Sequence, residues 1–272
     1  MTYINLIKQL GEIGACSPSH EALEILRVRF GKTREWCLAN RDVELPVGIE
    51  SVLNLRKSGV PLQYILGEAW FYGYRFIVNE NCLIPQPDTE HTVGISIENL
   101  PPNGKLLDLC TGSGCIPIAI LKETLSASAS ALEVSKSAID VATQNSILHN
   151  VTERLNIIEA DVLRDDITAL ISEADVITSN PPYIDTDVIA TLSDEVKHEP
   201  HIALDGGADG MVFYRHFIEN LSIHMKAGAV MILEIGYDQA DRIAKLCTQN
   251  RLSCRLHKDF SGNLRVAEIR KI

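Results

Sequence analysis

The sequence lacks any run of about 18 to 20 apolar residues, the length that a helix needs to cross a bilayer. Its amino terminus, MTYINLIKQLGEIG, also lacks the long apolar core of a signal peptide, because apolar and polar residues alternate there with a helical period. The seven cysteines are scattered and form no CxxC pair, so their spacing favours neither a zinc site nor a redox pair. These absences predict a cytoplasmic protein with reduced thiols and no bound metal.

Basic residues are also few, since 25 Lys and Arg are set against 36 Asp and Glu and the formal net charge is -11. Broad attraction to phosphate backbones needs clustered Lys and Arg. The charge balance therefore disfavours direct nucleic-acid binding and favours a protein or small-molecule partner. A hydrophobic content of 46% over 272 residues is typical of a folded chain with one large domain, or a medium domain and a small one.

The first 60 residues have a helical pattern and predict a small all-helical domain. The apolar residues that share one face of the first helix are Ile4, Ile7, Leu10 and Ile13. The apolar residues of the second helix are Ala22, Leu23, Ile25, Leu26 and Val28. A third apolar run covers residues 47–55. Residues 61–87 then become rich in aromatic and β-branched side chains, with a glycine in the middle of WFYGYRFIVN, which predicts a β-hairpin linker.

From residue 88 onward, segments typical of strands alternate with segments typical of helices. The expected strands are residues 105–109, 129–133, 156–159, 175–178, 229–234, 252–256 and 264–269. The expected helices are residues 115–125, 135–149, 210–225 and 238–249. Such alternation predicts an α/β domain with a mostly parallel sheet and helices on both of its faces.

The turn after the first expected strand is suited to a ligand. The segment LLDLCTGSGC, residues 106–115, combines an apolar strand with glycines that let a ligand approach the backbone, and the next helix offers unpaired N–H groups. The dinucleotide fingerprint GxGxxG needs glycine at position 117, but the chain has Pro117 there. The turn therefore disfavours a pyrophosphate-binding NAD site.

Two carboxylates follow the next two strands. Glu133 stands 21 residues after Gly112 (133 minus 112) and can accept hydrogen bonds from ribose hydroxyls, and Asp161 follows the third strand. Taken alone, the glycine turn is as often a plain turn as a site, Glu133 is more often a solvated strand end, and Asp161 is more often a helix cap or turn residue. Their joint position at the carboxyl ends of successive strands predicts a site for an adenosine without a diphosphate, which S-adenosylmethionine fits.

The fourth strand runs into a rigid corner, SNPPYI, residues 179–184. Each proline fixes φ and lacks an N–H donor, so neither a helix nor a central strand continues through it. A group to be methylated presents N–H donors, which the side-chain oxygen of Asn180 and the carbonyl of Pro181 can accept while Tyr183 stacks on its flat face. Prolines that hold these acceptors rigidly would preorganise such a site, although the motif alone also suits a plain surface turn.

Five segments of the chain resemble, in order, the protein-(glutamine-N5) methyltransferases that modify peptide chain release factors. They are PLQYILGE (61–68), LIPQPDTE (83–90), DLCTGSGC (108–115), SNPPYI (179–184) and EPHIALDGGADG (199–210). The resemblance covers nearly the whole chain. The SNPPYI corner is shared with amino-methylating enzymes of DNA and RNA, whereas LIPQPDTE, ALDGG and the helical domain are more specific. The chain departs from the family at Gln86, where arginine is usual, and at Glu133, where aspartate is common.

The resemblance implies a helical substrate-recognition domain over residues 1–60, a β-hairpin linker over 61–87, and a seven-stranded Rossmann-like class I methyltransferase domain over 88–272. It implies methyl transfer from S-adenosylmethionine to the glutamine N5 of the release-factor Gly-Gly-Gln motif, in translation termination, with S-adenosylhomocysteine as product. The implied cofactor residues are Asp108, Cys110, Thr111, Gly112, Ser113, Gly114, Glu133, Asp161, Val162 and Asn180. The implied catalytic and substrate residues are Asn180, Pro181, Pro182 and Tyr183.

Other functions stay open on the sequence alone. The same corner could methylate another protein glutamine or a nucleic-acid base, which the acidic composition disfavours. The chain could also be a non-catalytic binding protein that recognises a translation factor through its helical domain, and methyl transfer would distinguish the two. His198 and His201 flank Glu199, but HEPH lacks the spacing of a zinc-protease helix, so we interpret them as loop residues.

Overall fold

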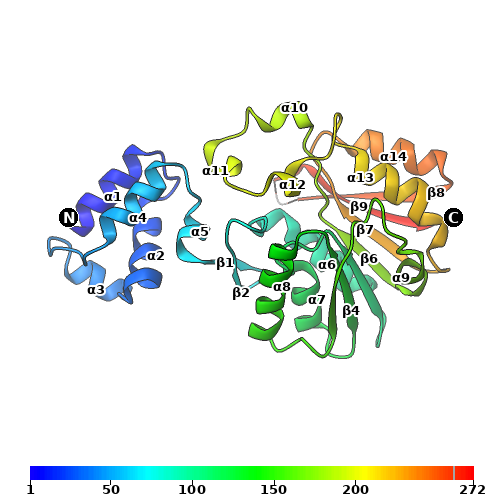
Figure 1. The fold of residues 1–272 in the computed structure, drawn as a ribbon, viewed down its shortest axis with the longest axis horizontal. Helices are drawn as coiled ribbons and strands as arrows, with labels where there is room; N and C mark the ends of the chain where they lie inside the picture. Colours follow the sequence, from blue (N-terminus) through cyan, green and yellow to red (C-terminus); the bar gives the residue numbers. More distant parts are fainter. Residues whose placement is uncertain (260) are drawn as a thin grey trace. The chain divides into compact units, whose positions relative to one another are not determined.

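The computed structural model describes residues 1–259 and 261–272, and this part of the chain forms two compact units (Figure 1). The first unit contains residues Met1–Glu68 and Ser193–His198. The second contains residues Ala69–Leu192 and Glu199–Ile272. The chain therefore leaves the second unit at Ser193 and returns to it at Glu199.

The first unit is built from short helices. Its helices among the described residues are α1 (Tyr3–Glu12), α2 (Pro18–Phe30), α3 (Arg34–Ala39), α4 (Ile49–Lys57), α5 (Leu62–Leu66) and α11 (Asp194–Lys197). Apolar side chains from α1 to α5 pack into one core. Its most central members are Leu6, Leu10, Ala22, Ile25, Leu26 and Cys37, all with no exposed surface.

Most of the predicted apolar face of α1 is confirmed, since Leu10 is buried and Ile7 and Ile13 pack against the core. Tyr3, Leu6 and Leu10 are buried, whereas Ile4 is 48% exposed. Tyr3 and Leu6 complete the buried face, because positions 3, 6 and 10 also fit a helical period of 3.6. Val47, at the start of the third apolar run, is also fully exposed.

The segment expected to be wholly extended begins with a helix. Residues 62–66 form α5, which starts after Pro61 and ends at Gly67 in the left-handed conformation (φ 75°). Ile65 of this helix is buried in the core of the first unit. The predicted hairpin follows, as strands β1 (Glu68–Phe71) and β2 (Tyr74–Ile77). They are joined by two residues with positive φ, which is typical of a type I′ turn.

The described part of the second unit contains a seven-stranded sheet with the order β5-β4-β3-β6-β7-β9-β8. The strands are β3 (Lys105–Leu109), β4 (Ser128–Glu133), β5 (Leu155–Glu159), β6 (Val176–Ser179), β7 (Val230–Glu234), β8 (Leu252–Lys258) and β9 (Leu264–Lys271). Strands β3 to β7 pair in parallel, and β9 runs antiparallel to both β7 and β8. This confirms the predicted mostly parallel α/β sheet with a reversed final hairpin.

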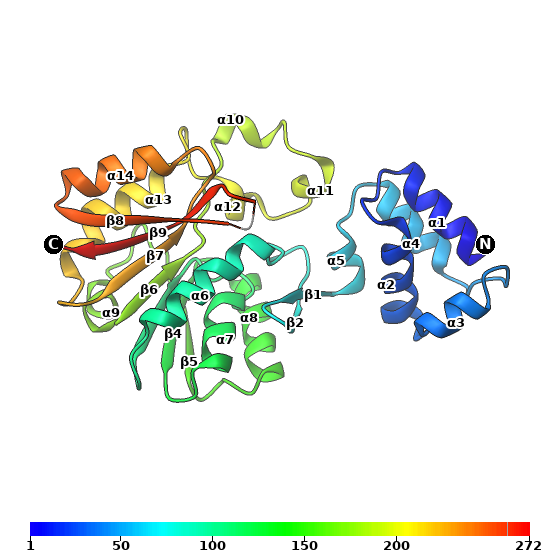
Figure 2. The same ribbon diagram turned by 180° about the vertical axis from the view of Figure 1, so that it is seen from behind.

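Helices cover both faces of the sheet (Figures 1 and 2). One face carries α6 (Glu90–Asn99), α7 (Cys115–Glu123) and α8 (Lys136–Leu148), and the other carries α9 (Thr168–Glu173), α13 (Val212–Arg215) and α14 (Ala240–Gln249). Neighbouring strand residues alternate between two cores, as in the pair Leu106 and Leu107. Both faces of the sheet are therefore buried.

The expected helix over residues 210–225 is not a single regular α-helix. α13 continues as a π-helix (His216–Leu221) and a short 3-10 helix (Ser222–His224), in which the Ser222 hydroxyl donates to the Ile218 carbonyl. One-turn helices α10 (Thr186–Ile189) and α12 (His201–Leu204) interrupt the expected loop, so His201 begins a helix. No helix in the described ranges is long and apolar enough to span a membrane.

Candidate active site

The carboxyl ends of the parallel strands bring the predicted functional segments to one edge of the sheet. The glycine-rich turn follows β3, Glu133 ends β4, Asp161 follows β5 and Asn180 follows β6. In the strand order, β3 lies between β4 and β6, so the connections from β3 and β6 lead to opposite sides. Open α/β sheets bind their ligands at such a switch point.

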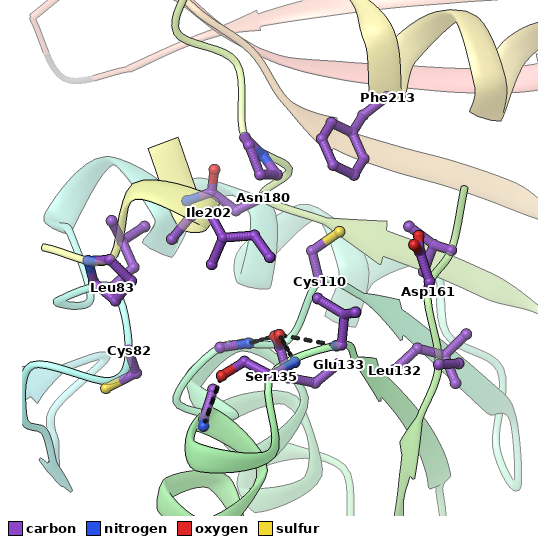
Figure 3. Close-up of a pocket in the computed structure, with 18 of the residues that line it drawn as sticks. Cys82, Leu83, Cys110, Leu132, Glu133, Ser135, Asp161, Asn180, Ile202 and Phe213 are labelled. Atoms are coloured by element: carbon purple, nitrogen blue, oxygen red, sulfur yellow. Dashed lines mark hydrogen bonds between the residues drawn. The ribbon is translucent and has the colours of Figure 1, made fainter. Parts of the chain in front are cut away.

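A cavity of about 200 Å³ lies at this edge (Figure 3). It brings together these residues of the sequence prediction: Cys110, Gly112, Glu133, Asp161, Val162, Asn180 and Pro182. Asn180 and Glu133 lie on opposite sides of the cavity in Figure 3, with Cys110 between them. The apolar wall was missed by the sequence analysis and includes Leu83, Leu132, Ala138, Ile202 and Phe213. A mostly apolar cavity with a few polar groups is typical of a small-molecule site.

Gly112 opens the turn toward the cavity. Its φ is +56°, and no described atom lies within 4 Å of the position that a Cβ would take. The backbone N–H of Gly112 donates to Oε2 of Glu133 over 2.8 Å. The turn and the end of β4 are therefore held together, with the glycine backbone exposed to an incoming ligand.

The Glu133 carboxylate organises this side of the cavity, as the dashed lines in Figure 3 show. Its Oε1 accepts the N–H groups of Val134 and Ser135 at 3.0 and 2.9 Å, and its Oε2 accepts the N–H of Gly112. Each carboxylate oxygen has about two acceptor positions. Oε2 therefore retains one position for a ligand hydroxyl, while Oε1 is saturated by the backbone.

Asp161 lines the cavity but is also a local turn residue. Its Oδ1 accepts the N–H of Leu163 at 3.0 Å, and its Oδ2 lies 3.4 Å from Nε of Arg164. Val162 beside it is buried. Asp161 is therefore both a turn residue and part of the cavity wall.

The remaining predicted cofactor residues lie in the glycine-rich turn or in the strand before it, outside the cavity lining. Among the described residues, Asp108, Thr111, Ser113 and Gly114 do not line the cavity. Burial raises the pKa of Asp108 to about 7, while its Oδ1 accepts the Thr178 hydroxyl at 2.6 Å. Oδ2 of Asp108 and the hydroxyl of Thr111 are both buried, and hydrogen bonding by Thr111 lowers the pKa of Asp108 against the larger effect of burial.

The corner at Asn180 is held by three segments distant in sequence. Nδ2 of Asn180 donates to the hydroxyl oxygen of Thr89 over 3.2 Å, and Nε2 of Gln239 donates to the Tyr183 carbonyl over 2.9 Å. Gly206 packs against the corner, because a Cβ there would lie only 2.8 Å from Cα of Tyr183. These contacts make the corner rigid before any ligand binds.

Pro181 and Tyr183 do not line the cavity within the part of the chain that the structure describes. The Tyr183 ring packs against the apolar core between the sheet and its outer helices. Burial raises the pKa of the Tyr183 hydroxyl well above its usual range, and nearby Glu234 acts in the same direction. The stacking of Tyr183 on a substrate therefore stays a prediction.

Glu234 is a further acidic residue at the same edge, and the sequence analysis gave it no role. It ends β7 and is only 2% exposed. Burial raises its pKa to about 7, with Thr89, Arg265 and Asn180 acting in the opposite direction. The signal was present in the sequence, because the predicted strand over residues 229–234 already ended in this carboxylate.

The segment around Gln86 forms an ion pair with an arginine of strand β9. Gln86 is exposed, and its Nε2 donates to the Ile84 carbonyl over 3.1 Å. Arg265 lies 3.2 Å from Asp88 of the same segment, measured from Nη2 to Oδ2. Glu199 accepts the backbone N–H of Ile84 at 2.9 Å, which gives this residue of HEPH a structural contact.

Two of the cysteines, Cys247 and Cys254, lie close enough for their thiols to interact, which raises the pKa of Cys247 and lowers that of Cys254. All seven cysteines lie in the described part of the chain and are free thiols. Residues 1–259 and 261–272 contain no cluster of three or more His, Cys, Asp or Glu that could hold a metal ion.

Comparisons with known proteins agree with this geometry. The family model described as "N-6 DNA Methylase" matches residues 89–250, and the model described as "PrmC N-terminal domain" matches residues 4–67. The release factor glutamine methyltransferase of Bacillus subtilis is 39% identical over 71% of this chain and 69% of its own length. That of Caulobacter vibrioides is 34% identical over 95% of this chain and 91% of its own length. The chain belongs to the release factor glutamine methyltransferase family.

Some relatives in this family are longer than the chain. The bifunctional methyltransferase of Rickettsia bellii is 33% identical to this chain over 96% of this chain's residues. This chain spans only 52% of the length of that protein. The crystal structure of ribosomal protein L11 methylase from Lactobacillus delbrueckii shares the methyltransferase fold, with a TM-score of 0.50 and 19% identity over 71% of this chain and 83% of that one. The fold is thus that of a Rossmann-like methyltransferase.

Proposed function

We propose that this chain transfers a methyl group from S-adenosylmethionine to the side-chain amide nitrogen of the glutamine in the Gly-Gly-Gln motif of peptide chain release factors. The observation that carries the proposal is the position of Asn180 at the edge of the cavity, with its amide nitrogen bonded to Thr89 and its oxygen left to accept. Family membership supports the same substrate, because the relatives in Bacillus subtilis and Caulobacter vibrioides are named for it.

The residues of the cavity fit S-adenosylmethionine. The open face of Gly112 admits the methionine part, and Oε2 of Glu133 retains an acceptor position for a ribose hydroxyl. Asp108 lies outside the cavity and supports the turn, with the Thr178 hydroxyl donating to its Oδ1. Val162 and Phe213 offer apolar surface for an adenine ring. When bound, this cofactor supplies a methyl group on a positively charged sulfur.

The corner residues act on the substrate amide. An amide nitrogen is a poor nucleophile because its lone pair is delocalised into the carbonyl. Acceptors at Asn180 and Pro181 that bind both N–H groups direct electron density back to the nitrogen and favour the positive charge that develops on it during attack. A preorganised contribution of this kind is worth roughly 3 to 4 kcal/mol when one group is removed.

We expect the first unit to recognise the release factor, since it carries none of the residues proposed for the chemistry. This unit includes α11, whose residue Glu195 forms an ion pair with Arg56 of α4 at 2.7 Å. Deleting residues 1–60 would also remove the partner of Glu195, so a folded truncation is not a clean test. Charge-reversal variants of exposed residues on α2 and α3 keep this pairing and should raise the KM for the release factor without changing the KM for the cofactor.

A second candidate is methylation of an exocyclic amino group on a nucleic-acid base. The match of residues 89–250 to the N-6 DNA methylase model favours it, because the cofactor edge and the corner are shared between the two activities. The formal charge of -11 opposes it.

The deciding experiment supplies the protein with labelled S-adenosylmethionine and one of four acceptors. These are a release factor, the same factor with glutamate replacing its Gly-Gly-Gln glutamine, ribosomal RNA and DNA. We expect label on the first acceptor alone. Label on a nucleic acid would establish the second candidate, and equal label on the glutamate variant would place the modified residue elsewhere in the release factor.

A further inference from the structure

The side chain of Glu234 is buried beside the corner without a full set of partners. Its carboxylate is 2% exposed, and no described donor forms a hydrogen bond with Oε2. A buried carboxylate oxygen without a partner is destabilising, because it loses the hydrogen bonds that water gives it in the unfolded chain. A carboxylate kept at this buried position despite that cost indicates a role in the neighbouring site.

The sheet register places Glu234 next to Asn180. Ser179 of β6 pairs with Leu233 of β7, so the residues that follow, Asn180 and Glu234, are neighbours across the two strands. Hydrogen bonding by Asn180 and Thr89 lowers the pKa of Glu234 against the larger effect of burial, in agreement with the position that the register gives to Asn180. Thr89 also accepts Nδ2 of Asn180. These three side chains form a polar cluster that we call the Asn180 cluster.

The cluster discriminates between the two orientations of the Asn180 amide. An amide presents donors on its nitrogen and acceptors on its oxygen, and a flip by 180° exchanges them. Thr89 Oγ1 and an ionised Glu234 both present acceptors to this amide. The nitrogen is therefore favoured on the side of the cluster, and the oxygen on the other side.

We infer that Glu234 and Thr89 are positioning residues that hold the Asn180 amide with its oxygen free to accept N–H groups of the substrate. This inference rests on the proposed function of the site for its catalytic consequence, but the orientation itself is a property of the protein alone. The cluster selects a substrate that donates N–H over one that presents oxygen. It thereby distinguishes glutamine from an ionised glutamate.

The charge of Glu234 should govern this orientation. Ionised, the carboxylate only accepts; protonated, it can also donate to Oδ1 of Asn180 and so stabilise the flipped amide. The charged and titratable groups that face it are Arg265 of β9, Asp88, Tyr183, Tyr214 and Cys115. Burial raises the pKa of Glu234 to about 7, so the flipped form gains population as the pH falls through that value.

The first test is the pH profile of methyl transfer to the release factor at saturating cofactor. We expect kcat of the wild type to fall on the acid side of about pH 7. Glu234→Gln cannot ionise and, like the protonated carboxyl, carries both a donor and an acceptor, so we expect a low kcat that no longer changes with pH across this range. Thr89→Val and Glu234→Leu should lower kcat about 10-fold or more, with little change in the KM for the cofactor. Ser222→Ala removes a buried hydroxyl whose hydrogen-bond partner is the Ile218 carbonyl, outside the cluster, and serves as the control for burial effects.

A second test needs no substrate. In ¹⁵N-labelled protein, the side-chain NH₂ signal of Asn180, assigned by its loss in Asn180→Ala, should shift with pH in the wild type and stay constant in Glu234→Gln. An unlabelled release factor together with a titrating Asn180 signal would overturn the proposed function and leave the positioning role intact. The positioning role would be overturned by a different result: the release factor is labelled, but the Asn180 signal does not change with pH and the pH profile of Glu234→Gln equals that of the wild type.

Discussion

The side-chain nitrogen of Asn180 donates a hydrogen bond to the hydroxyl oxygen of Thr89, which lies 3.2 Å away and 91 residues earlier in the chain. This bond joins the corner after β6 to the segment that begins α6. It gives the amide a direction before any substrate is present.

Replacing Asn180 tests the acceptor directly. Asn180→Ala removes the acceptor oxygen and should lower the rate of methyl transfer on the order of 100-fold, while affinity for S-adenosylhomocysteine changes little. From the sequence alone, Asn180→Asp retains an acceptor and should keep some activity. The neighbouring buried Glu234 changes this expectation, because a second carboxylate there is held protonated or displaced. Asn180→Asp should therefore be nearly as inactive as Asn180→Ala, as measured with labelled cofactor and a release factor.

Glu133→Ala tests the cofactor side of the cavity. The substitution removes the acceptor of three backbone N–H groups as well as the position available to a ribose hydroxyl. Calorimetry should show affinity for S-adenosylhomocysteine weakened by roughly 1 to 3 kcal/mol. Glu159→Ala is the matched control, since Glu159 pairs with Glu133 in register but does not line the described cavity. Equal losses in both variants would contradict the assigned role.

Gly206→Ala tests the packing that holds the corner. A Cβ at this position would lie 2.8 Å from Cα of Tyr183 and 2.9 Å from the Pro182 carbonyl oxygen, so the backbone has to shift. We expect a loss of about 1 to 3 kcal/mol in the free energy of unfolding, together with reduced activity. Gly94→Ala, in α6, meets no described atom within 4 Å and should be neutral or slightly stabilising. Urea denaturation of the two variants compares them directly.

The pH dependence of stability should reveal the buried carboxyls. Burial raises the pKa of Asp108 and of Glu234 to about 7 in the folded state, whereas the unfolded chain releases these protons near pH 4. The unfolded state therefore binds fewer protons between about pH 4 and 7, and the free energy of unfolding falls as the pH rises through this window. A tenfold difference in the acidity of one carboxyl between the two states corresponds to about 1.4 kcal/mol.

Asp108→Asn removes one of these two titrations. We expect the difference in unfolding free energy between pH 5 and pH 7 to become smaller than in the wild type. Asp187→Asn, at an exposed position of α10, should keep the wild-type difference. A variant at Asp108 with an unchanged pH slope would show that this carboxyl is ionised in the folded protein.

The strands and most helices of the second unit could be predicted because their signals are local. Strand β3 (Lys105–Leu109) matches the prediction to the residue, since an apolar run ends there at a glycine-rich turn. The carboxylates that follow successive strands predicted the edge at which the cavity lies. The π-helix from His216 to Leu221 was missed, because the choice between α and π hydrogen bonding depends on packing against the sheet.

The Asn180 cluster could not be predicted, because its members come from segments far apart in the sequence. The neighbourhood of Asn180 and Glu234 depends on the pairing and register of β6 and β7, two strands that a long connection separates. Thr89 was recognised only as part of a family segment. The apolar wall at Ile202 and Phe213 was missed for the same reason, since ordinary hydrophobic side chains become a binding surface only when the fold encloses them.

The return of the chain to the first unit at Ser193–His198 has a consequence for biosynthesis. Arg56 is buried between Glu21 and Glu195, and Glu195 emerges from the ribosome 139 residues after Arg56 (195 minus 56). At a rate of synthesis of about 5 to 20 residues per second, Glu195 is added to the chain roughly 7 to 28 s after Arg56. We therefore expect the amino-terminal helices on stalled ribosomes to gain full resistance to proteolysis only in nascent chains that expose Glu195. The unit that is translated first is thus completed late.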